Sequence, residues 1–356
     1  MKIIKTADHS KTTILKTAIK VLTAGGLVIY PTETVYGAGV DATNQTAVKK
    51  LLAYKSRREG KPLSIAVAST IMAQKYAQLN SQALSLHQKF LPGPYTIISK
   101  AESNLADGVA SEFGTIGIRI PDHELVTDLT TALNKPITAT SANISGKKRP
   151  YTIQDIFSNL STKQRSLIDL VIDAGELPPN EPSTVIDTTL STPLTVRGNM
   201  FSHKNNLALI SCSDQETIDI AGKFLLKYWD EIKNRGLVIG LNGELGAGKT
   251  MFAKGIGQFL KIPQLITSPT YTYIKEYSYN RHNIEGIFYH IDTWKIDQAE
   301  NAQLLEIEGL IKPKNIVAIE WWTQIEKFLP EIKPQLIIDI QILSYYQRQL
   351  TFIEKP

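Results

Sequence analysis

Residues 237–250 of this 356-residue chain have the sequence LVIGLNGELGAGKT, an apolar run followed by a glycine-rich loop. The run LVIGL predicts a short buried strand, and TMFAKGIGQFL at 250–260 can continue as a helix. Within the loop, Gly243 to Thr250 match the pattern GxxxxGK[ST] in full. The sequence therefore predicts a strand, a loop and a helix in that order, the local arrangement of a phosphate-binding loop.

Each part of this loop suits a nucleotide. Glycine lets the loop curl so that backbone N–H groups point at phosphate oxygens, and the helix adds its positive end. The Lys249 ammonium would reach the terminal phosphates, and the Thr250 hydroxyl could ligate Mg²⁺. We therefore expect ATP and Mg²⁺ as cofactors here. The loop residues expected to bind ATP are Gly243, Gly246, Ala247, Gly248, Lys249 and Thr250.

Two later segments of the same half are apolar runs that end in an acid. Residues 287–292, IFYHID, end at Asp292, and residues 315–320, NIVAIE, end at Glu320. Hydrolysis of a nucleotide needs an acid that holds the metal and a means of placing water. Either acid could instead be a surface charge at a strand end. The phosphate loop in the same half favours a site role for both.

The composition is that of a globular protein. Hydrophobic residues make up 42% and charged residues 21%, and the length predicts about two domains. These values exclude a mainly disordered or fibrous chain. The single cysteine, Cys212, excludes an internal disulfide and a zinc site of four cysteines, and it favours a reducing, cytoplasmic setting. The start has no apolar core of signal-peptide length, and no run approaches the roughly 18 residues that span a membrane.

The polar segment at 198–206, GNMFSHKNN, shows no periodicity and predicts a linker. We expect one domain over 1–199, a second over 207–356, and a linker at about 200–206. Residues 1–198 contain 22 Lys and Arg against 16 Asp and Glu, whereas residues 199–356 contain 17 against 18. The surplus of positive charge in the first half favours anionic ligands, although a surplus of this size is common in proteins without them.

Strand and helix signals alternate in both halves, which predicts an α/β fold with two domains. The first is expected to have one mixed sheet, and the second to be a small α/β domain around the phosphate loop. Strands are expected in the first half at 27–30, 63–68, 95–99, 115–120, 137–140, 170–175 and 183–188. Helices are expected there at 45–54, 70–90, 122–133 and 152–160, after one containing Ile14 to Leu22 that Gly25 ends. The second half is expected to have a helix at 214–233 and strands at 237–241, 271–277, 286–291, 315–320 and 335–353.

The first half contains no GxSxG, HExxH or paired CxxC motif, so its chemistry would rest on positioning and electrostatics. Its candidates follow predicted elements. Lys55, Arg57 and Lys61 lie in KSRREGKP, where two converging cations and a third would suit a triphosphate and a carboxylate. A solvated run of charge is the alternative. Ser141 and Asn143, in TSANISG, alternate so that both side chains can point into one pocket.

The second half resembles the TsaE family of small P-loop ATPases of tRNA threonylcarbamoylation. The matching stretches are NGELGAGKT, SPTYTYIKEY, YHIDTWKI, LLEIEGL and IEWW, which together cover roughly 207–354. The resemblance implies Mg²⁺ contacts from Thr250 and Glu320, a role near the γ-phosphate for Asp292, and a switch-like role for Thr270. It places Arg348 near the nucleotide. The family usually has an arginine where this chain has Lys295, which keeps the charge but loses the bidentate fork.

The first half resembles the YrdC/TsaC family of threonylcarbamoyl-AMP synthases. The matching stretches, in family order, are YPTETVYGAG, KSRREGKPL, LPGPYT, TIGIRIPDH, TSANISG, PSTVID and VRGN. The family joins L-threonine, bicarbonate and ATP and releases pyrophosphate. The resemblance implies a hallmark catalytic set of Lys55, Arg57, Ser141 and Asn143. It implies that Thr32, Lys55, Arg57, Arg119, Ser141 and Ser183 line the threonine–carbonate region, and that Lys61, Thr115, Asn143, Ser145 and Arg197 contact the nucleotide.

Together the resemblances imply a bifunctional protein of threonylcarbamoyladenosine biosynthesis. The first domain would make the activated intermediate, and the second would hydrolyse ATP to support a transfer complex of the TsaD and TsaB type. tRNA would be an indirect partner, and no membrane is expected.

Three alternatives stay open at this point. The first half could be an RNA-binding module, whose affinity would fall steeply with salt, although aromatic residues interleaved for stacking are absent. The second half could be a small-molecule kinase, or an inactive nucleotide-binding domain because of Lys295.

Overall fold

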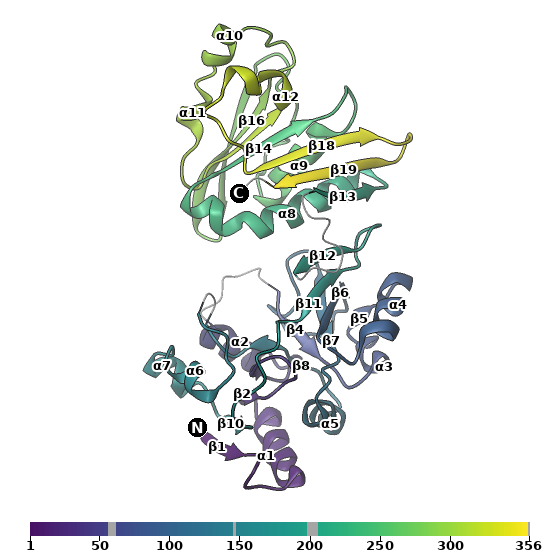
Figure 1. Cartoon of the computed structure of the whole chain (residues 1–356), viewed down its shortest axis with the longest axis vertical. Coiled ribbons are helices and arrows are strands. Elements are labelled where there is room, and N and C mark those ends of the chain that lie inside the picture. The colour runs from purple at the N-terminus through teal and green to yellow at the C-terminus, as the bar shows by residue number, and fades with distance from the viewer. Residues whose placement is uncertain (56–61, 145–146, 198–205, 355–356) are drawn as a thin grey trace. The chain divides into compact units, whose positions relative to one another are not determined.

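The computed structural model describes residues 1–55, 62–144, 147–197 and 206–354, and Figure 1 shows the chain. It forms two compact units. The first comprises Met1–Thr189 and Pro193–Phe201, and the second Leu190–Thr192 and Ser202–Pro356. Both are α/β, as the sequence predicts. The exact domain limits and the linker stay a proposal, because residues 198–205 lie outside the described part.

The strands of the first unit divide between two sheets, whereas the sequence predicts one. The first sheet has parallel pairing between three strands and antiparallel pairing between the rest. In order, it contains β1 (Lys2–Lys5), β10 (Leu170–Asp173), β2 (Val28–Tyr30), β3 (Gly37–Gly39) and β9 (Thr140–Ser141). Sequence patterns do not give the division because β3 and β9 are too short to show a period.

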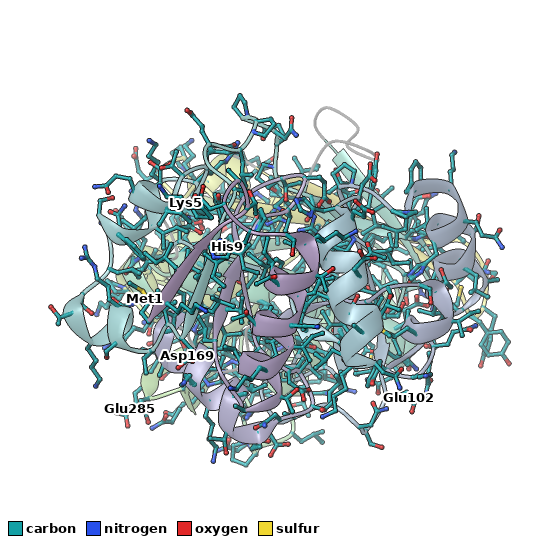
Figure 2. The ribbon with its side chains drawn as sticks, turned by 90° about the horizontal axis from the view of Figure 1, so that it is seen from below. Met1, Lys5, His9, Glu102, Asp169 and Glu285 are labelled. Carbon is teal, nitrogen blue, oxygen red and sulfur yellow. The ribbon has the colours of Figure 1, made fainter. Side chains whose placement is uncertain are left out.

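Asp169, labelled in Figure 2, joins elements of this sheet. Its Oδ2 accepts the N–H of Leu27 at 2.7 Å and pairs with the Lys50 ammonium at 2.7 Å. Its backbone carbonyl accepts the N–H of Lys2 at 2.8 Å. Asp169, the residue that precedes β10, therefore holds both the start of β1 and Leu27, the residue that precedes β2.

The second sheet of the first unit is longer. In order, it contains β12 (Leu194–Arg197), β11 (Thr184–Asp187), β6 (Tyr95–Ala101), β7 (Thr115–Arg119), β4 (Ser64–Ala66) and β8 (Ile137–Thr138), with β5 (Ala77–Gln78) paired to β6. β9 of the first sheet follows β8 of the second after one residue. The segment 137–141 therefore connects the two sheets, and this junction brings the polar segment after it close to β4 and β7.

Helices surround both sheets of the first unit. They are α1 (Lys11–Thr23), α2 (Gln45–Lys55), α3 (Thr70–Ala73), α4 (Ser81–Phe90), α5 (Glu124–Leu133), α6 (Ile153–Phe157) and α7 (Thr162–Ser166). The prediction of a single helix at 70–90 is wrong, because β5 interrupts it. The Asn80 side chain accepts the N–H of Ala83 at 2.8 Å, which starts α4 as a new helix.

The second unit is built on one sheet of seven strands. Its order is β13 (Asn206–Ser211), β19 (Arg348–Glu354), β18 (Leu336–Ile342), β14 (Leu237–Asn242), β17 (Ile316–Glu320), β16 (Ile284–Asp292) and β15 (Ile274–Arg281). The four strands from β18 to β16 are parallel. The strand predicted at 335–353 is a hairpin of two strands, and the strand predicted from 271 begins only after Tyr273, whose φ is 60°.

The helices of the second unit are α8 (Asp214–Asn234), α9 (Lys249–Phe259), α10 (Ala299–Gln303), α11 (Ile307–Leu310) and α12 (Trp322–Ile325), with a 3-10 turn at Glu326–Phe328. Along the chain, α8 follows the edge strand β13, and the other helices follow β14, β16 and β17. The Ser213 side chain accepts the N–H of Glu216 at 3.1 Å and caps α8, which confirms the predicted start. Among the residues that the structure describes, no helix is long and apolar enough to cross a membrane.

β14 is the central strand that leads into the phosphate loop, and its packing is close. A Cβ added to Gly240 would lie 2.8 Å from Cγ of Trp322, whose indole is buried. A Cβ added to Gly309, in α11, would meet nothing within 4 Å. Gly309 therefore serves as a control for Gly240: an added methyl group would clash at Gly240 and meet open space at Gly309.

We expect Gly240→Ala to destabilise the second unit by about 2 kcal/mol, because it overpacks a dense core. Gly309→Ala should leave stability unchanged or raise it by up to about 1 kcal/mol. Urea unfolding followed by tryptophan fluorescence measures both, since the four tryptophans all lie between 229 and 322. Equal effects of the two substitutions would contradict the packing argument.

Candidate functional sites

The second unit holds a cavity of about 510 Å³ at the carboxyl ends of its parallel strands. The loop from Gly243 to Gly248 connects β14 to α9 and forms one wall. Gly243, Gly246 and Gly248 have φ of 142°, 78° and 109°, a region that favours glycine. A Cβ on Gly243 would also lie 2.5 Å from the carbonyl oxygen of Ile340. The positive φ values therefore favour glycine at these three positions, and the close carbonyl of Ile340 also favours it at Gly243.

Lys249 reaches back over this loop. Its ammonium donates to the carbonyl oxygens of Gly243 at 2.7 Å and Glu244 at 3.0 Å. The indole of Trp321 lies on another side, with its ring centroid 3.8 Å from Nζ. Burial lowers the pKa of Lys249, while the carboxylates of Glu320 and Asp292 act to raise it. A phosphate at this position would meet a desolvated cation.

The two predicted acids lie side by side. Asp292 ends β16 and Glu320 ends β17, and the two residues are register partners. Both are buried and line the cavity. The Thr250 hydroxyl donates to Oε1 of Glu320 at 2.9 Å, and Nε2 of His290 donates to the same oxygen at 2.8 Å. His290, on the neighbouring strand β16, therefore also holds the carboxylate, a contact that the sequence reasoning did not identify.

Asp292 is the centre of a second set of bonds. Its Oδ2 accepts the Thr270 hydroxyl at 2.7 Å and the Ser268 hydroxyl at 3.4 Å, and its Oδ1 accepts the N–H of Trp294 at 3.0 Å. Carboxylate and hydroxyl oxygens are the ligands that Mg²⁺ prefers. The oxygens of Thr250, Glu320 and Asp292 face one cavity and so fit the predicted cation.

The remaining predicted residues of this unit differ in their placement. Arg348 lines the cavity, and its Nε donates to the carbonyl of Ala247 at 3.2 Å. Lys295 is exposed and does not line it; its Nζ lies 5.6 Å from the ring centroid of Tyr271. Trp294 and Trp321 line the cavity with ring centroids 5.0 Å apart. Asp214 and Thr217, from the first turn of α8, also line it, and only the sheet order could have revealed them.

The first unit holds a separate cavity of about 480 Å³. It lies where the segment 139–143 meets β4, β7, β11 and β12. Most of its described polar lining comes from residues that the sequence predicts. The described basic residues that line it are Lys55, Arg119, Arg149 and Arg197, and no acid is among the described lining residues.

Lys55 is the last residue of α2 and is buried. Its ammonium donates to the carbonyl oxygen of Ser141 at 2.7 Å and to that of Asn143. The side chains of Ser141 and Asn143 line the same cavity, as their alternation predicts. Arg57, Lys61 and Ser145, also predicted for this site, lie outside the described residues.

Arg119 ends β7 and turns its guanidinium into the cavity wall. Nη2 donates to Oε1 of Glu33 at 2.7 Å and to the Thr34 hydroxyl at 3.4 Å. The Glu33 and Arg119 side chains are only 15% and 11% exposed. The pair is buried, and Glu33 itself does not line the cavity.

The structure differs from the prediction at Thr32, which is not among the lining residues. Its hydroxyl donates to the carbonyl of Val35 at 2.7 Å and accepts the N–H groups of Thr34 and Val35. The side chain therefore closes its own turn, a common use of threonine. Thr34 and Val35 line the cavity instead, because Thr32 stabilises the loop that presents them.

The opposite wall comes from β11 and β12. Arg197 donates from Nε to the carbonyl of Ser183 at 2.9 Å and from Nη2 to its hydroxyl at 2.8 Å. Thr96 lies 3.0 Å from the same hydroxyl. Burial, with Arg119 and Arg149 nearby, lowers the pKa of Arg197. Thr115, at the start of β7, lines the cavity and contacts the Ser111 hydroxyl at 2.7 Å.

Two family models match the chain. The first, Sua5_yciO_yrdC, described as telomere recombination, matches residues 20–198, about half of the chain. The second, described as threonylcarbamoyl adenosine biosynthesis protein TsaE, matches residues 212–350. Each match falls on one unit and contains that unit's cavity residues.

Similar proteins agree with these matches. A relative from Methanocaldococcus jannaschii is 39% identical over 186 residues, 52% of this chain and 86% of that protein. The threonylcarbamoyl-AMP synthase of Psychromonas ingrahamii is 35% identical over 163 residues, 45% of this chain and 84% of that protein. A solved structure of a Sua5 variant from P. abyssi has a TM-score of 0.52 at 20% identity, covering 96% of this chain and 99% of that one, which is a likeness of fold alone.

The buried pair of the first unit gives a prediction about stability. We expect Glu33→Gln to lower the free energy of unfolding of this unit by about 3 kcal/mol, because it leaves the Arg119 charge buried without its partner. Glu181→Gln is the matched control: Glu181 pairs with Arg149 at the surface, where the side chains are 83% and 47% exposed. It should cost less than about 1 kcal/mol.

Denaturant unfolding followed by circular dichroism measures both substitutions. Tryptophan fluorescence identifies the transition of the second unit, so the remaining transition belongs to the first. A loss for Glu33→Gln no larger than for Glu181→Gln would show that the pair does not stabilise the cavity wall.

Proposed function

The chain belongs to the Sua5/YciO/YrdC family and carries a TsaE domain after it, and from this premise we propose a bifunctional enzyme of tRNA threonylcarbamoyladenosine biosynthesis. The first unit would form threonylcarbamoyl-AMP and pyrophosphate from L-threonine, bicarbonate and ATP. The second would hydrolyse ATP in support of a threonylcarbamoyl-transfer complex of the TsaD and TsaB type. tRNA would be an indirect partner of this protein, reached through that complex.

The observation that carries the first activity is the cluster of cations on one cavity. N-carboxylated threonine is an anion, and it must attack the α-phosphate of ATP, which is also anionic. A carboxylate oxygen forms the new bond to phosphorus, and the bond to the β-phosphate breaks, so that pyrophosphate leaves with the electron pair. Lys55, Arg119 and Arg197 line the cavity where both anions would bind. Their charges offset the repulsion that otherwise raises the barrier.

Polar groups in the same cavity would orient the reactants. On the threonine side we assign Lys55, Arg119, Ser141 and Ser183, together with Arg57. On the nucleotide side we assign Asn143, Thr115 and Arg197, together with Lys61 and Ser145. Because Thr32 is committed to its own turn, we assign Thr34 to the wall in its place. No covalent intermediate with the enzyme is required, so alignment of the two anions supplies the catalysis.

In the second unit the glycine loop and Lys249 would bind the phosphates of ATP, with Arg348 nearby. Thr250 and Glu320 would hold Mg²⁺, and Asp292 would lie toward the γ-phosphate. When bound, the cation would offset the negative charge of the phosphates. The hydrogen bonds from Thr250 and His290 to one oxygen of Glu320 support this assignment, because they fix the carboxylate before the nucleotide arrives. Lys295, exposed and outside the cavity lining, would contribute positive charge without a bidentate contact.

Pyrophosphate separates the two activities, since the synthase releases it and the ATPase releases phosphate. We expect the purified chain with ATP, Mg²⁺, bicarbonate and L-threonine to release pyrophosphate only when threonine and bicarbonate are both present. Lys249→Ala should abolish threonine-independent phosphate release. Phosphate without any pyrophosphate would contradict the synthase and favour an RNA-binding role for the first unit, which a salt-dependent RNA titration would reveal.

A second experiment addresses the ATPase. We expect Glu320→Gln to lower kcat for phosphate release by a factor of about 100 or more, because the amide keeps the shape but loses the charge that would hold the metal. Turnover is measured with and without partner proteins of the TsaD and TsaB type. Glu326→Gln, in the nearby 3-10 turn and outside the cavity, is the control. No phosphate release by the unaltered chain under either condition would leave only a binding role.

A further inference from the structure

Tyr54 is buried completely and is not among the residues that line the cavity of the first unit. It precedes Lys55 at the end of α2. Its hydroxyl donates to the carbonyl oxygen of Ala142 at 2.5 Å, across 88 positions of sequence. The sequence motifs gave this tyrosine no role, and the assignments above do not use it.

Tyr54 and Lys55 hold three consecutive carbonyl groups. Lys55 takes those of Ser141 and Asn143, and Tyr54 takes the one between them. The chain bends at Ala142 and Asn143, directly after β9. The last two residues of α2 therefore hold three successive carbonyl groups of this bend.

Other contacts hold the rest of this segment. β9 (Thr140 and Ser141) pairs with β3, and beyond it the N–H of Ala142 donates to the carbonyl of Tyr36 at 2.8 Å. The Asn143 side-chain amide donates to the carbonyls of Lys147 at 2.8 Å and Lys148 at 3.1 Å, and the Tyr54 hydroxyl holds the Ala142 carbonyl. Tyr54 is itself anchored, because the Gln164 side-chain amide donates to its backbone carbonyl at 2.8 Å. Rigid support therefore passes from α7 through the end of α2 to the segment.

We propose that Tyr54 is a positioning residue for the first cavity: its hydroxyl fixes the Ala142 carbonyl so that the side chains of Ser141 and Asn143 keep their orientation toward the reactants. The consequence for catalysis rests on the proposed synthase function, whereas the consequence for the backbone does not. Burial raises the pKa of Tyr54, so the hydroxyl stays protonated and remains a donor throughout the working pH range.

The ordinary alternative is that Tyr54 only fills the core. The chain offers a control for it in the same unit. Tyr30 is equally buried, and its hydroxyl donates to the backbone carbonyl of Thr138 at 3.0 Å. Thr138 does not line the cavity. Tyr54→Phe and Tyr30→Phe thus each remove one buried hydroxyl and leave one buried carbonyl, with the aromatic ring retained.

The test compares the two variants of the full chain in three measurements. We expect similar losses of melting temperature in the first unit. We expect Tyr54→Phe to lower kcat for threonine-dependent pyrophosphate release about tenfold at saturating substrates, with Tyr30→Phe within twofold of the unaltered chain. Amide hydrogen exchange across Ser141 to Asn143 should be faster in Tyr54→Phe than in Tyr30→Phe.

Unchanged exchange in Tyr54→Phe overturns the proposal, and so does a kcat within twofold of the unaltered chain or an equal loss of kcat in both variants. If the unaltered chain releases no pyrophosphate, the proposed synthase function fails. The exchange measurement then decides alone whether Tyr54 positions the segment.

Discussion

Basic side chains held by main-chain carbonyl groups are the interaction on which both cavities depend. Lys55 and Arg197 in the first unit, and Lys249 and Arg348 in the second, each donate to carbonyl oxygens of nearby loops or strands. A carbonyl is a neutral acceptor, so it orients a cation without cancelling its charge. The energetic cost of burying the cation is partly offset while its field remains available to an anion. A carboxylate in place of the carbonyl would bind the cation more strongly, but it would cancel the positive charge that attracts an anionic ligand.

Arg119 and Arg149 also line the first cavity, but they pair with the carboxylates of Glu33 and Glu181. Of these two pairs, Arg119–Glu33 is the buried one. Arg119 lies at the end of a buried strand, and its side chain is 11% exposed, so a guanidinium without a partner would be costly to bury there. Glu33 stabilises it from behind the cavity wall, and the turn closed by Thr32 presents Glu33 at the correct position. A residue predicted to touch substrate thus acts on the site through the backbone of its own loop.

Sequence patterns predict features formed by residues close together in the chain. They do not predict contacts between residues that only the folded topology brings together. The loop at 243–250 is identified because glycine, lysine and threonine have roles at fixed spacing along one turn. Ser141 and Asn143 are placed in one pocket by simple alternation. The contact of Lys55 with their carbonyls spans 86 to 88 positions, and no periodicity reports it. The predicted helix at 70–90 failed because the cap at Asn80 competes with continuation. His290 and Tyr54 contact residues far from them in sequence, and Asp214 lies at a cavity built by distant segments, so sequence patterns do not report these placements.

The two cavities use acidic residues in opposite ways, and this difference fits two different reactions. The described lining of the first contains four basic residues and no acid, so the side chains themselves supply the positive charge that two reacting anions need. The second has Asp292 and Glu320 beside Lys249, an arrangement that repels a bare triphosphate but attracts one accompanied by a divalent cation. On the proposed function, the two acids would face the phosphates through a cation. The register of β16 and β17 places Asp292 beside Glu320, and this pairing would supply the negative charge for that cation.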